Sequence, residues 1–154
     1  MRRRVLSMLV LLAAASLGAA PEGSDLSKLQ GCWETSVGRR REISVTIEIK
    51  GNDVAATVTP KVGPKLRVSG ELQVDEAASP RSLDWVKFST LDGQEIPRLL
   101  SIYRLEGDRL VVRSGGFNDS RPKVFEKGGE GVWSEVVVFT RPAAPKPDAV
   151  TSNP

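Results

Sequence analysis

No histidine occurs among the 154 residues of the chain, and this absence removes several kinds of catalytic site. Histidine is the commonest general base near neutral pH, and it takes part in the Ser-His-Asp and Cys-His arrangements that activate a nucleophile. It is also one of the usual ligands of zinc. We therefore expect no catalytic residue, no cofactor and no metal ion in this protein.

Cysteine is almost absent too, since Cys32 is the only one, so the fold must be stabilised by packing without an internal disulfide. The preceding Leu29-Gln30-Gly31 makes Cys32 resemble a lipoprotein processing box, which would attach a lipid to the thiol. Such a box adjoins an apolar leader, whereas here a proline and charged residues intervene and Gln30 fits the box poorly. We expect instead a small, half-buried thiol at the start of a strand.

The amino end has the three-part order of a signal peptide. Arg2–Arg4 precede an apolar run at Val5–Ala20, which is shorter than the roughly 20 residues needed to cross a bilayer and ends in small residues. We predict a signal peptide at 1–20, with cleavage after Gly18 favoured because Pro21 follows Ala20. The protein is then exported to the periplasm or the extracellular space, without a membrane span after cleavage. The alternatives are an uncleaved anchor and a buried helix.

The excess of positive charge belongs to this leader. The chain has 22 Lys and Arg against 19 Asp and Glu, and Arg2–Arg4 account for the difference. Because the rest of the chain is neutral, nothing in the overall charge points to a nucleic-acid partner. One basic run remains at Arg39–Arg41. Without interleaved aromatic residues, we interpret it as a solvated loop, with a phosphate or polyanion contact as the alternative.

Apolar and polar residues alternate along most of the remaining chain, as they do in half-buried strands. The clearest case is Ile43–Lys50, which Gly51-Asn52 joins to a second strand at 54–59. Gly70 interrupts the apolar face of a strand at 66–74 and indicates a bulge or bend, with close approach of a ligand as the alternative. Further strands are expected from Cys32 onward and at 82–90, 99–105, 110–114 and 132–140.

About eight closely spaced strands without a long helix between them favour an antiparallel sandwich or barrel. A single helical turn at Ser24–Gln30, capped by Ser24 or Asp25, precedes them. We predict one all-β domain over 24–141. The segment 142–154 contains four prolines and one large apolar residue, and we expect a disordered Pro-rich tail there.

Two residues favour the barrel over the sandwich. Gly31-Cys32-Trp33 directly after a helical turn resembles the Gly-x-Trp element of lipocalins. In that family the tryptophan lies across the closed end of the barrel, and an arginine after the last strand stacks on it. Arg141 is the matching candidate, so the resemblance implies barrel closure by Trp33 and Arg141. The alternative is a core tryptophan in another β fold.

Five short segments extend the pattern over the chain: Leu29–Trp33, Pro80–Asp84, Ile102–Leu110, Arg121–Phe125 and Phe139–Arg141. Together they resemble an uncharacterised secreted, lipocalin-like domain family known chiefly from Planctomycetes, over residues 26–141. The chain departs from this family at Cys32, Ser101 and Arg113. The resemblance implies a single lipocalin-like β-barrel of about eight strands. It carries over no catalytic or ligand residue, because the family has none established.

Other polar motifs are weak. Asp75, Glu76 and Asp84 could form a carboxylate pair, but acids in strand ends and loops are usually solvated. Glycine-rich segments at 114–118 and 128–131 lack the lysine and helix of a phosphate loop, and we expect both to flank an open mouth of the barrel.

Three functions remain open. The first is a non-catalytic, monomeric module that binds a small lipophilic ligand inside the barrel. The second is a domain with a solid core whose loops bind another protein of the cell envelope. The third, an enzyme, has the least support. The first hypothesis fails if Trp85, Phe88, Phe125 and the aliphatic residues fill the interior.

Overall fold

The structure is a computed structural model, and it describes residues 23–117, 120–126 and 136–143. The predicted signal peptide, the glycine-rich loop at 128–131 and residues 144–154 of the predicted tail lie outside the described residues. Within the part that is described, no helix is long and apolar enough to cross a membrane.

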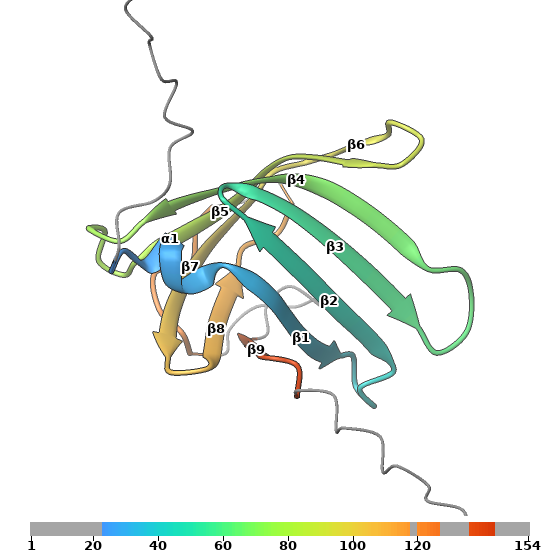
Figure 1. Cartoon of the computed structure of the whole chain (residues 1–154), viewed down its shortest axis with the longest axis horizontal. Coiled ribbons are helices and arrows are strands. Elements are labelled where there is room, and N and C mark those ends of the chain that lie inside the picture. Colours follow the sequence, from blue (N-terminus) through green and yellow to red (C-terminus); the bar gives the residue numbers. More distant parts are fainter. Residues whose placement is uncertain (1–22, 118–119, 127–135, 144–154) are drawn as a thin grey trace, which may run out of the picture.

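In the part of the chain that is described, one short helix, α1 (Asp25–Leu29), precedes the strands. The Ser24 side chain caps it by accepting a hydrogen bond from the backbone N–H of Ser27 at 3.2 Å. Leu29, at its other end, is fully buried. The indole Nε1–H of Trp33 donates to the Leu29 carbonyl at 2.8 Å and ties the helix to the first strand. α1 therefore lies across one end of the sheet (Figure 1).

The described residues form nine antiparallel strands in one sheet. Eight of them close into a barrel in the order β4-β3-β2-β1-β9-β8-β7-β5, because β5 also pairs with β4, while the two-residue β6 pairs only with β5. The predicted all-β antiparallel barrel of about eight strands with a short N-terminal helix is confirmed. The strands are β1 (Gly31–Val37), β2 (Ile43–Lys50), β3 (Asp53–Pro60), β4 (Leu66–Asp75), β5 (Ser82–Thr90), β6 (Glu95–Ile96), β7 (Leu99–Glu106), β8 (Arg109–Ser114) and β9 (Val136–Thr140).

The connections divide the barrel into two ends. α1, the tight turns at 51–52 and 107–108 and the connection at 76–81 lie at one end, which we call the closed end. Gln30 exchanges two side-chain hydrogen bonds with Gly51, and the Arg141 N–H reaches the Asp108 carbonyl there. The loops at 38–42, 61–65 and 91–94 follow strands that run away from α1. They form the opposite end, which we call the open end (Figure 1).

Gly70 marks a bulge, as the sequence predicted. The register between β4 and β5 shifts between Ser69 and Glu71. A Cβ atom on Gly70 would lie 2.4 Å from the ring of Phe88, so only glycine fits beneath this side chain. The space next to the Gly70 backbone is thus filled by the ring of Phe88, and not by a ligand as the alternative interpretation supposed.

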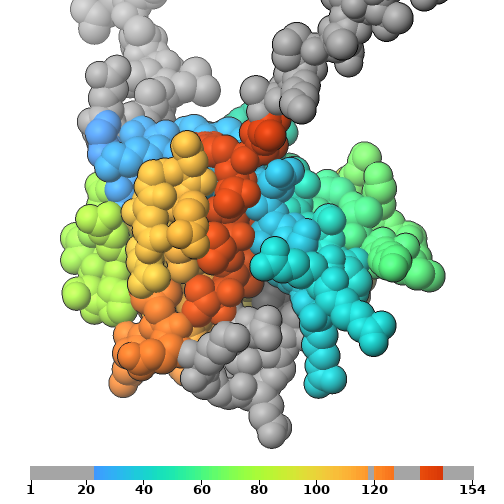
Figure 2. Space-filling view, turned by 90° about the horizontal axis from the view of Figure 1, so that it is seen from below, coloured from blue at the N-terminus to red at the C-terminus, as the bar shows by residue number. Residues whose placement is uncertain are grey.

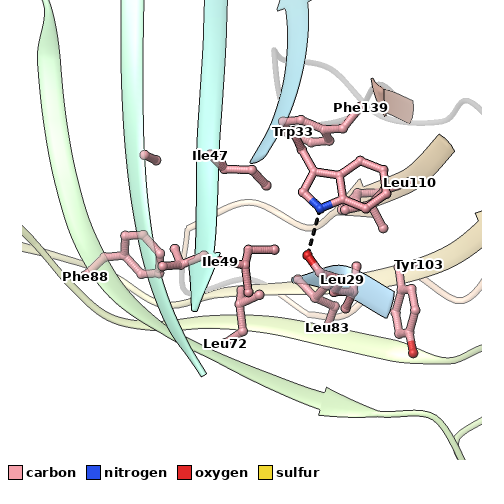
Figure 3. Packing of buried hydrophobic residues seen from close by; sticks show 13 residues of the cluster. Leu29, Trp33, Ile47, Ile49, Leu72, Leu83, Phe88, Tyr103, Leu110 and Phe139 are labelled. Atoms are coloured by element: carbon pink, nitrogen blue, oxygen red, sulfur yellow. Dashed lines mark hydrogen bonds between the residues drawn. The ribbon is translucent and has the colours of Figure 1, made fainter. Parts of the chain in front are cut away.

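The core fills the closed half of the barrel. Figure 3 shows Trp33 beside Leu110 and Phe139, with the indole N–H directed at the Leu29 carbonyl. All the largest fully buried side chains of the interior cluster belong to this half. They are Leu29, Trp33, Ile47, Ile49, Leu72, Leu83, Tyr103 and Leu110.

A second buried patch lies on the outside of the barrel. Ile102 and Val111 are 0% and 2% exposed, yet they alternate along their strands with residues of the interior cluster and so face outward. Residues 120–126 are held against this face. Arg121 forms a two-pronged ion pair with Asp84, and Arg113 donates to the Val124 carbonyl at 2.6 Å. The expectation that Asp84 is solvated was therefore wrong.

Candidate functional site

The structure brings Trp33 and Arg141 together at the closed end. The guanidinium carbon of Arg141 lies 3.8 Å from the centre of the Trp33 ring system. The same guanidinium donates to the carbonyls of Lys28 at 2.7 Å and Gln30 at 2.6 Å, at the end of α1. Arg141 thus satisfies carbonyls that a helix end leaves without partners, and it covers the indole at the same time.

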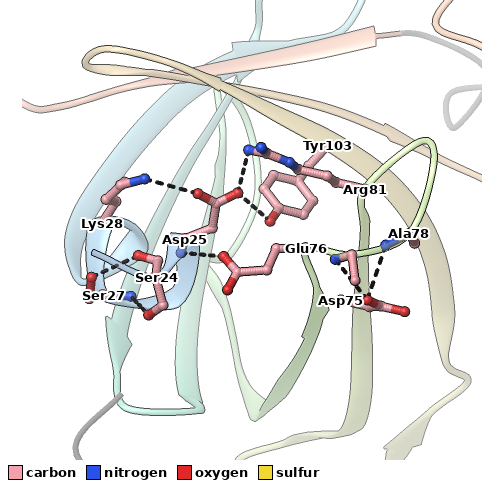
Figure 4. A network of polar contacts seen from close by, with 10 residues as sticks. Ser24, Asp25, Ser27, Lys28, Asp75, Glu76, Ala78, Arg81 and Tyr103 are labelled. Atoms are coloured by element: carbon pink, nitrogen blue, oxygen red, sulfur yellow. Dashed lines mark hydrogen bonds and ion pairs between the residues drawn. The ribbon is translucent and has the colours of Figure 1, made fainter. Parts of the chain in front are cut away.

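A buried polar network lies beside this pair (Figure 4). Asp25 is 3% exposed, and its carboxylate accepts hydrogen bonds from Tyr103 at 2.8 Å, Arg81 at 2.7 Å and Lys28 at 3.2 Å. Burial alone would raise the pKa of Asp25, but these three partners outweigh it and leave the pKa lowered. Burial and the bond to Asp25 raise the pKa of Tyr103 well above its usual value.

This network holds α1 against the barrel, because the Asp25 side chain and backbone are hydrogen-bonded to residues of the barrel. The Asp25 backbone N–H donates to Glu76 at 2.7 Å, and Asp75 accepts from the N–H groups of Ala77 and Ala78. The two acids considered as a catalytic pair therefore serve the helix and a turn separately. Sequence reasoning treated Asp25 only as a possible cap, and its contact with Tyr103 spans 78 positions. Within the described ranges, no group of His, Cys, Asp or Glu could hold a metal ion.

On the wall formed by β1–β4, burial of the inner face declines from the closed end to the open end. Along β2, Ile49 and Ile47 are 1% and 2% exposed, whereas Val45 and Ile43 on the same face are only half-buried. The trend is repeated on β4, where Leu72 is fully buried and Leu66 is 46% exposed. The part of the open half formed by β1–β4 is therefore lined by apolar side chains that the described residues cover incompletely, whereas Phe88 and Leu99 on β5 and β7 are buried.

A cleft of about 700 Å³ opens where β1 and β9 diverge. Among the described residues, Glu34 opposite Thr140 is the one ladder pair between these strands, and the Thr35 hydroxyl donates to the Val138 carbonyl at 2.8 Å beyond it. Inner-face residues of β1, β2 and β9 line the cleft together with residues of their outer face. The cleft thus leads from the surface to the half-buried inner wall.

The lining of this cleft combines three kinds of side chain. Valines from three strands form its apolar part, hydroxyl groups stand between them, and charged groups lie toward its margin. Its volume falls within the roughly 300–1,000 Å³ typical of small-molecule sites. The members are Glu34, Thr35, Ser36, Val37, Gly38, Arg41, Ser44, Val45, Thr46, Arg109, Val136, Val137, Val138 and Thr140.

The aromatic residues considered as fillers of the interior are divided between two places. Trp85 and Phe88 form an edge-to-face pair with ring centres 5.9 Å apart, and both belong to or pack on the interior cluster. Phe125 lies outside, with the Arg104 guanidinium 4.7 Å above its ring. None of the three lines the cleft.

Cys32 is exposed, so the expectation of a half-buried thiol was wrong. It lies in β1, next to the buried Trp33, and its side chain points to the opposite face of the strand. Its carbonyl accepts a hydrogen bond from Arg141 at 3.3 Å. The Cys32 backbone thus takes part in the contacts of Arg141 at the closed end.

Comparison of the chain with protein-family models, with curated proteins and with solved structures gives no match. The resemblance to a secreted lipocalin-like family accordingly stays a prediction, and the function has to be argued from the geometry of the barrel.

Proposed function

We propose that this protein is a non-catalytic binding module that holds a small apolar ligand in the open half of its barrel. The observation that carries the proposal is the decline of burial along the inner face, which leaves valines half-buried beside a cleft of about 700 Å³. Apolar surface of this kind gains about 25 cal/mol per Å² when a ligand removes it from water.

The margin of the cleft favours a ligand with one polar end. Thr35 and Thr46 bring hydroxyl groups to the lining and Arg41 brings a positive charge, whereas Arg109 already pairs with Glu106 at 3.6 Å. Such groups fix the orientation of a ligand whose apolar body lies against the valines. The ligand class proposed is therefore a small lipophilic molecule with a polar or anionic head. Export, inferred from the leader, and a monomeric state form part of the same proposal.

Titration with a fluorescent fatty-acid analogue tests this function. We expect one saturable site per chain, and a loss of affinity of about 10-fold or more when Val37→Thr and Val45→Thr are combined, because each removes apolar contact at nearly constant volume. Val68→Thr with Val74→Thr is the matched control, since both valines are half-buried and belong to β4 but neither lines the cleft. Absence of saturable binding, or equal losses in the two double variants, would overturn the proposal.

A further inference from the structure

Two loops lie side by side at the open end. The last residue of β3, Pro60, pairs with Ile43, the first residue of β2. Just beyond this pair, the Lys61 N–H donates to the Glu42 carbonyl at 2.8 Å. The loop at 38–42 and the segment at 61–67 therefore form one continuous surface, which we call the basic rim. Figure 2 shows the 38–42 segment, in cyan, projecting at the end away from α1.

The basic rim concentrates unpaired positive charge. It contains six cationic side chains and one carboxylate, Glu42. That carboxylate folds back onto its own loop, where it accepts the Arg40 N–H at 2.7 Å. No ion pair to another described residue is formed by any of the six, and all are exposed. They are Arg39, Arg40, Arg41, Lys61, Lys65 and Arg67.

Exposed apolar side chains stand among these cations. Val62 is 87% exposed and Leu66 is 46% exposed. Single exposed valines or leucines are common on protein surfaces. Here, however, Val62 directly follows Lys61 at a loop tip, and Leu66 lies between Lys65 and Arg67. Cationic groups that surround projecting apolar groups match a lipid surface, where headgroups carry the negative charge and the acyl boundary lies just below.

We propose that the basic rim docks the open end of the barrel onto a membrane surface that contains anionic lipids. A nucleic acid fits less well, because the rim has no aromatic residue for base stacking and a phosphate backbone would leave Val62 in water. The distribution of charge favours the same orientation. At the closed end, the acidic residues Asp53, Asp75, Glu76, Glu106 and Asp108 stand among the basic residues Lys28, Lys50, Arg81, Arg109 and Arg141. The excess of positive charge therefore lies at the basic rim, and an anionic surface attracts that end more strongly.

The basic rim adjoins the cleft, since Arg41 belongs to both. Docking through the rim therefore brings the cleft close to the lipid surface, where a lipophilic ligand would be met. The docking itself does not depend on a ligand, because the charges and apolar tips are present in the bare protein. Membrane docking and ligand binding can consequently fail or succeed separately.

Sedimentation with vesicles tests the docking. Protein is recovered after expression of the full chain, and mass spectrometry verifies that all variants share one N-terminus. We expect binding to vesicles of phosphatidylcholine with phosphatidylglycerol, little binding to phosphatidylcholine alone, and weakening by added salt because the attraction is screened. Equal binding to both vesicles, or none to the anionic ones, would overturn the proposal.

Matched variants locate the contact. Lys61→Gln with Lys65→Gln is expected to weaken vesicle binding about 30-fold, since each basic residue near an anionic surface contributes about a fivefold factor. Lys28→Gln with Lys50→Gln removes the same charge from the closed end and should leave binding unchanged. Val62→Ser should weaken it about fivefold with all charges kept. If the closed-end control variant loses as much vesicle binding as the rim variant, the contact is not at the rim. If heparin binds the chain and Val62→Ser has no effect on vesicle binding, the rim recognises polyanions and not a lipid surface.

Discussion

The two ends of this barrel are built from the same strands but in opposite ways. At the closed end, Trp33 is buried, its indole N–H and its covering Arg141 have partners, and the carboxylate of Asp25 has three. At the open end, inner-face valines are half-buried and the cations of the basic rim stand free of ion pairs with described residues. The difference teaches that the buried core and its polar contacts are concentrated at one end, and that the proposed binding surfaces lie at the other.

The difference between the two ends also explains why the net charge of the chain is a poor guide to its electrostatic partners. Outside the leader, the positive and negative charges balance, so the sequence alone offers no electrostatic partner. In the fold the basic rim gathers positive charge at one end, whereas acidic and basic residues are mixed at the other. The local field at each end, and not the sum over the chain, decides which surface the protein approaches.

The largest expected effect is at the closed end. Trp33→Ala should lower the free energy of unfolding by about 3–5 kcal/mol, because it leaves a cavity and removes the surface on which Arg141 stacks. Leu66→Ala at the open end should cost less than about 1 kcal/mol, since nearly half of that side chain is already in water. Urea unfolding measures both. Similar losses of unfolding free energy in the two variants would contradict the view that stability is concentrated at the closed end.

Asp25→Asn should lower the free energy of unfolding by about 2 kcal/mol, because it removes a charge that Arg81 and Tyr103 contact. The lowered pKa of Asp25 also sets a pH dependence. Its contribution is complete above the unfolded pKa of about 3.8 and is lost as the pH falls through the lower folded value. The difference between wild type and variant should therefore shrink below about pH 4. A difference that stays constant down to pH 2 would contradict this role.

A third effect, of about the same size as that of Asp25→Asn, is expected at the middle of the wall. Gly70→Ala should cost about 1–3 kcal/mol, because the new methyl group would meet the Phe88 ring at 2.4 Å. In a Phe88→Leu background, where the ring is absent, the same substitution should cost clearly less. Thermal or urea unfolding of the wild type, the two single variants and the double variant gives the coupling free energy between positions 70 and 88. Purely additive costs would show that the clash with Phe88 is not the cause.

Local patterns made part of this structure predictable. Alternation in 43–50, the turn at Gly51 and the bulge at Gly70 depend on a few neighbouring residues, and each was expected from the sequence. The pairing of Trp33 with Arg141 came from a resemblance, and the structure places the two in contact. What could not be predicted depends on distant parts of the chain.

Two examples show why. Asp25 meets Tyr103 only after the barrel closes, and Arg121 meets Asp84 only when the segment after β8 folds back over the outer wall. The candidate cleft is of the same kind, because it arises where β1 and β9 diverge. The sequence of either strand does not indicate how many residues of β1 and β9 pair with each other. The cleft between them therefore becomes visible only in the folded structure.

The most direct test of the binding role is native mass spectrometry of the protein purified from its own host. The account predicts one small lipophilic molecule per chain, of a size that fits a cleft of about 700 Å³, and its loss when Val37→Thr and Val45→Thr are combined. A chain that carries no such molecule, and that also fails to take up a fatty-acid analogue after purification, would contradict the account.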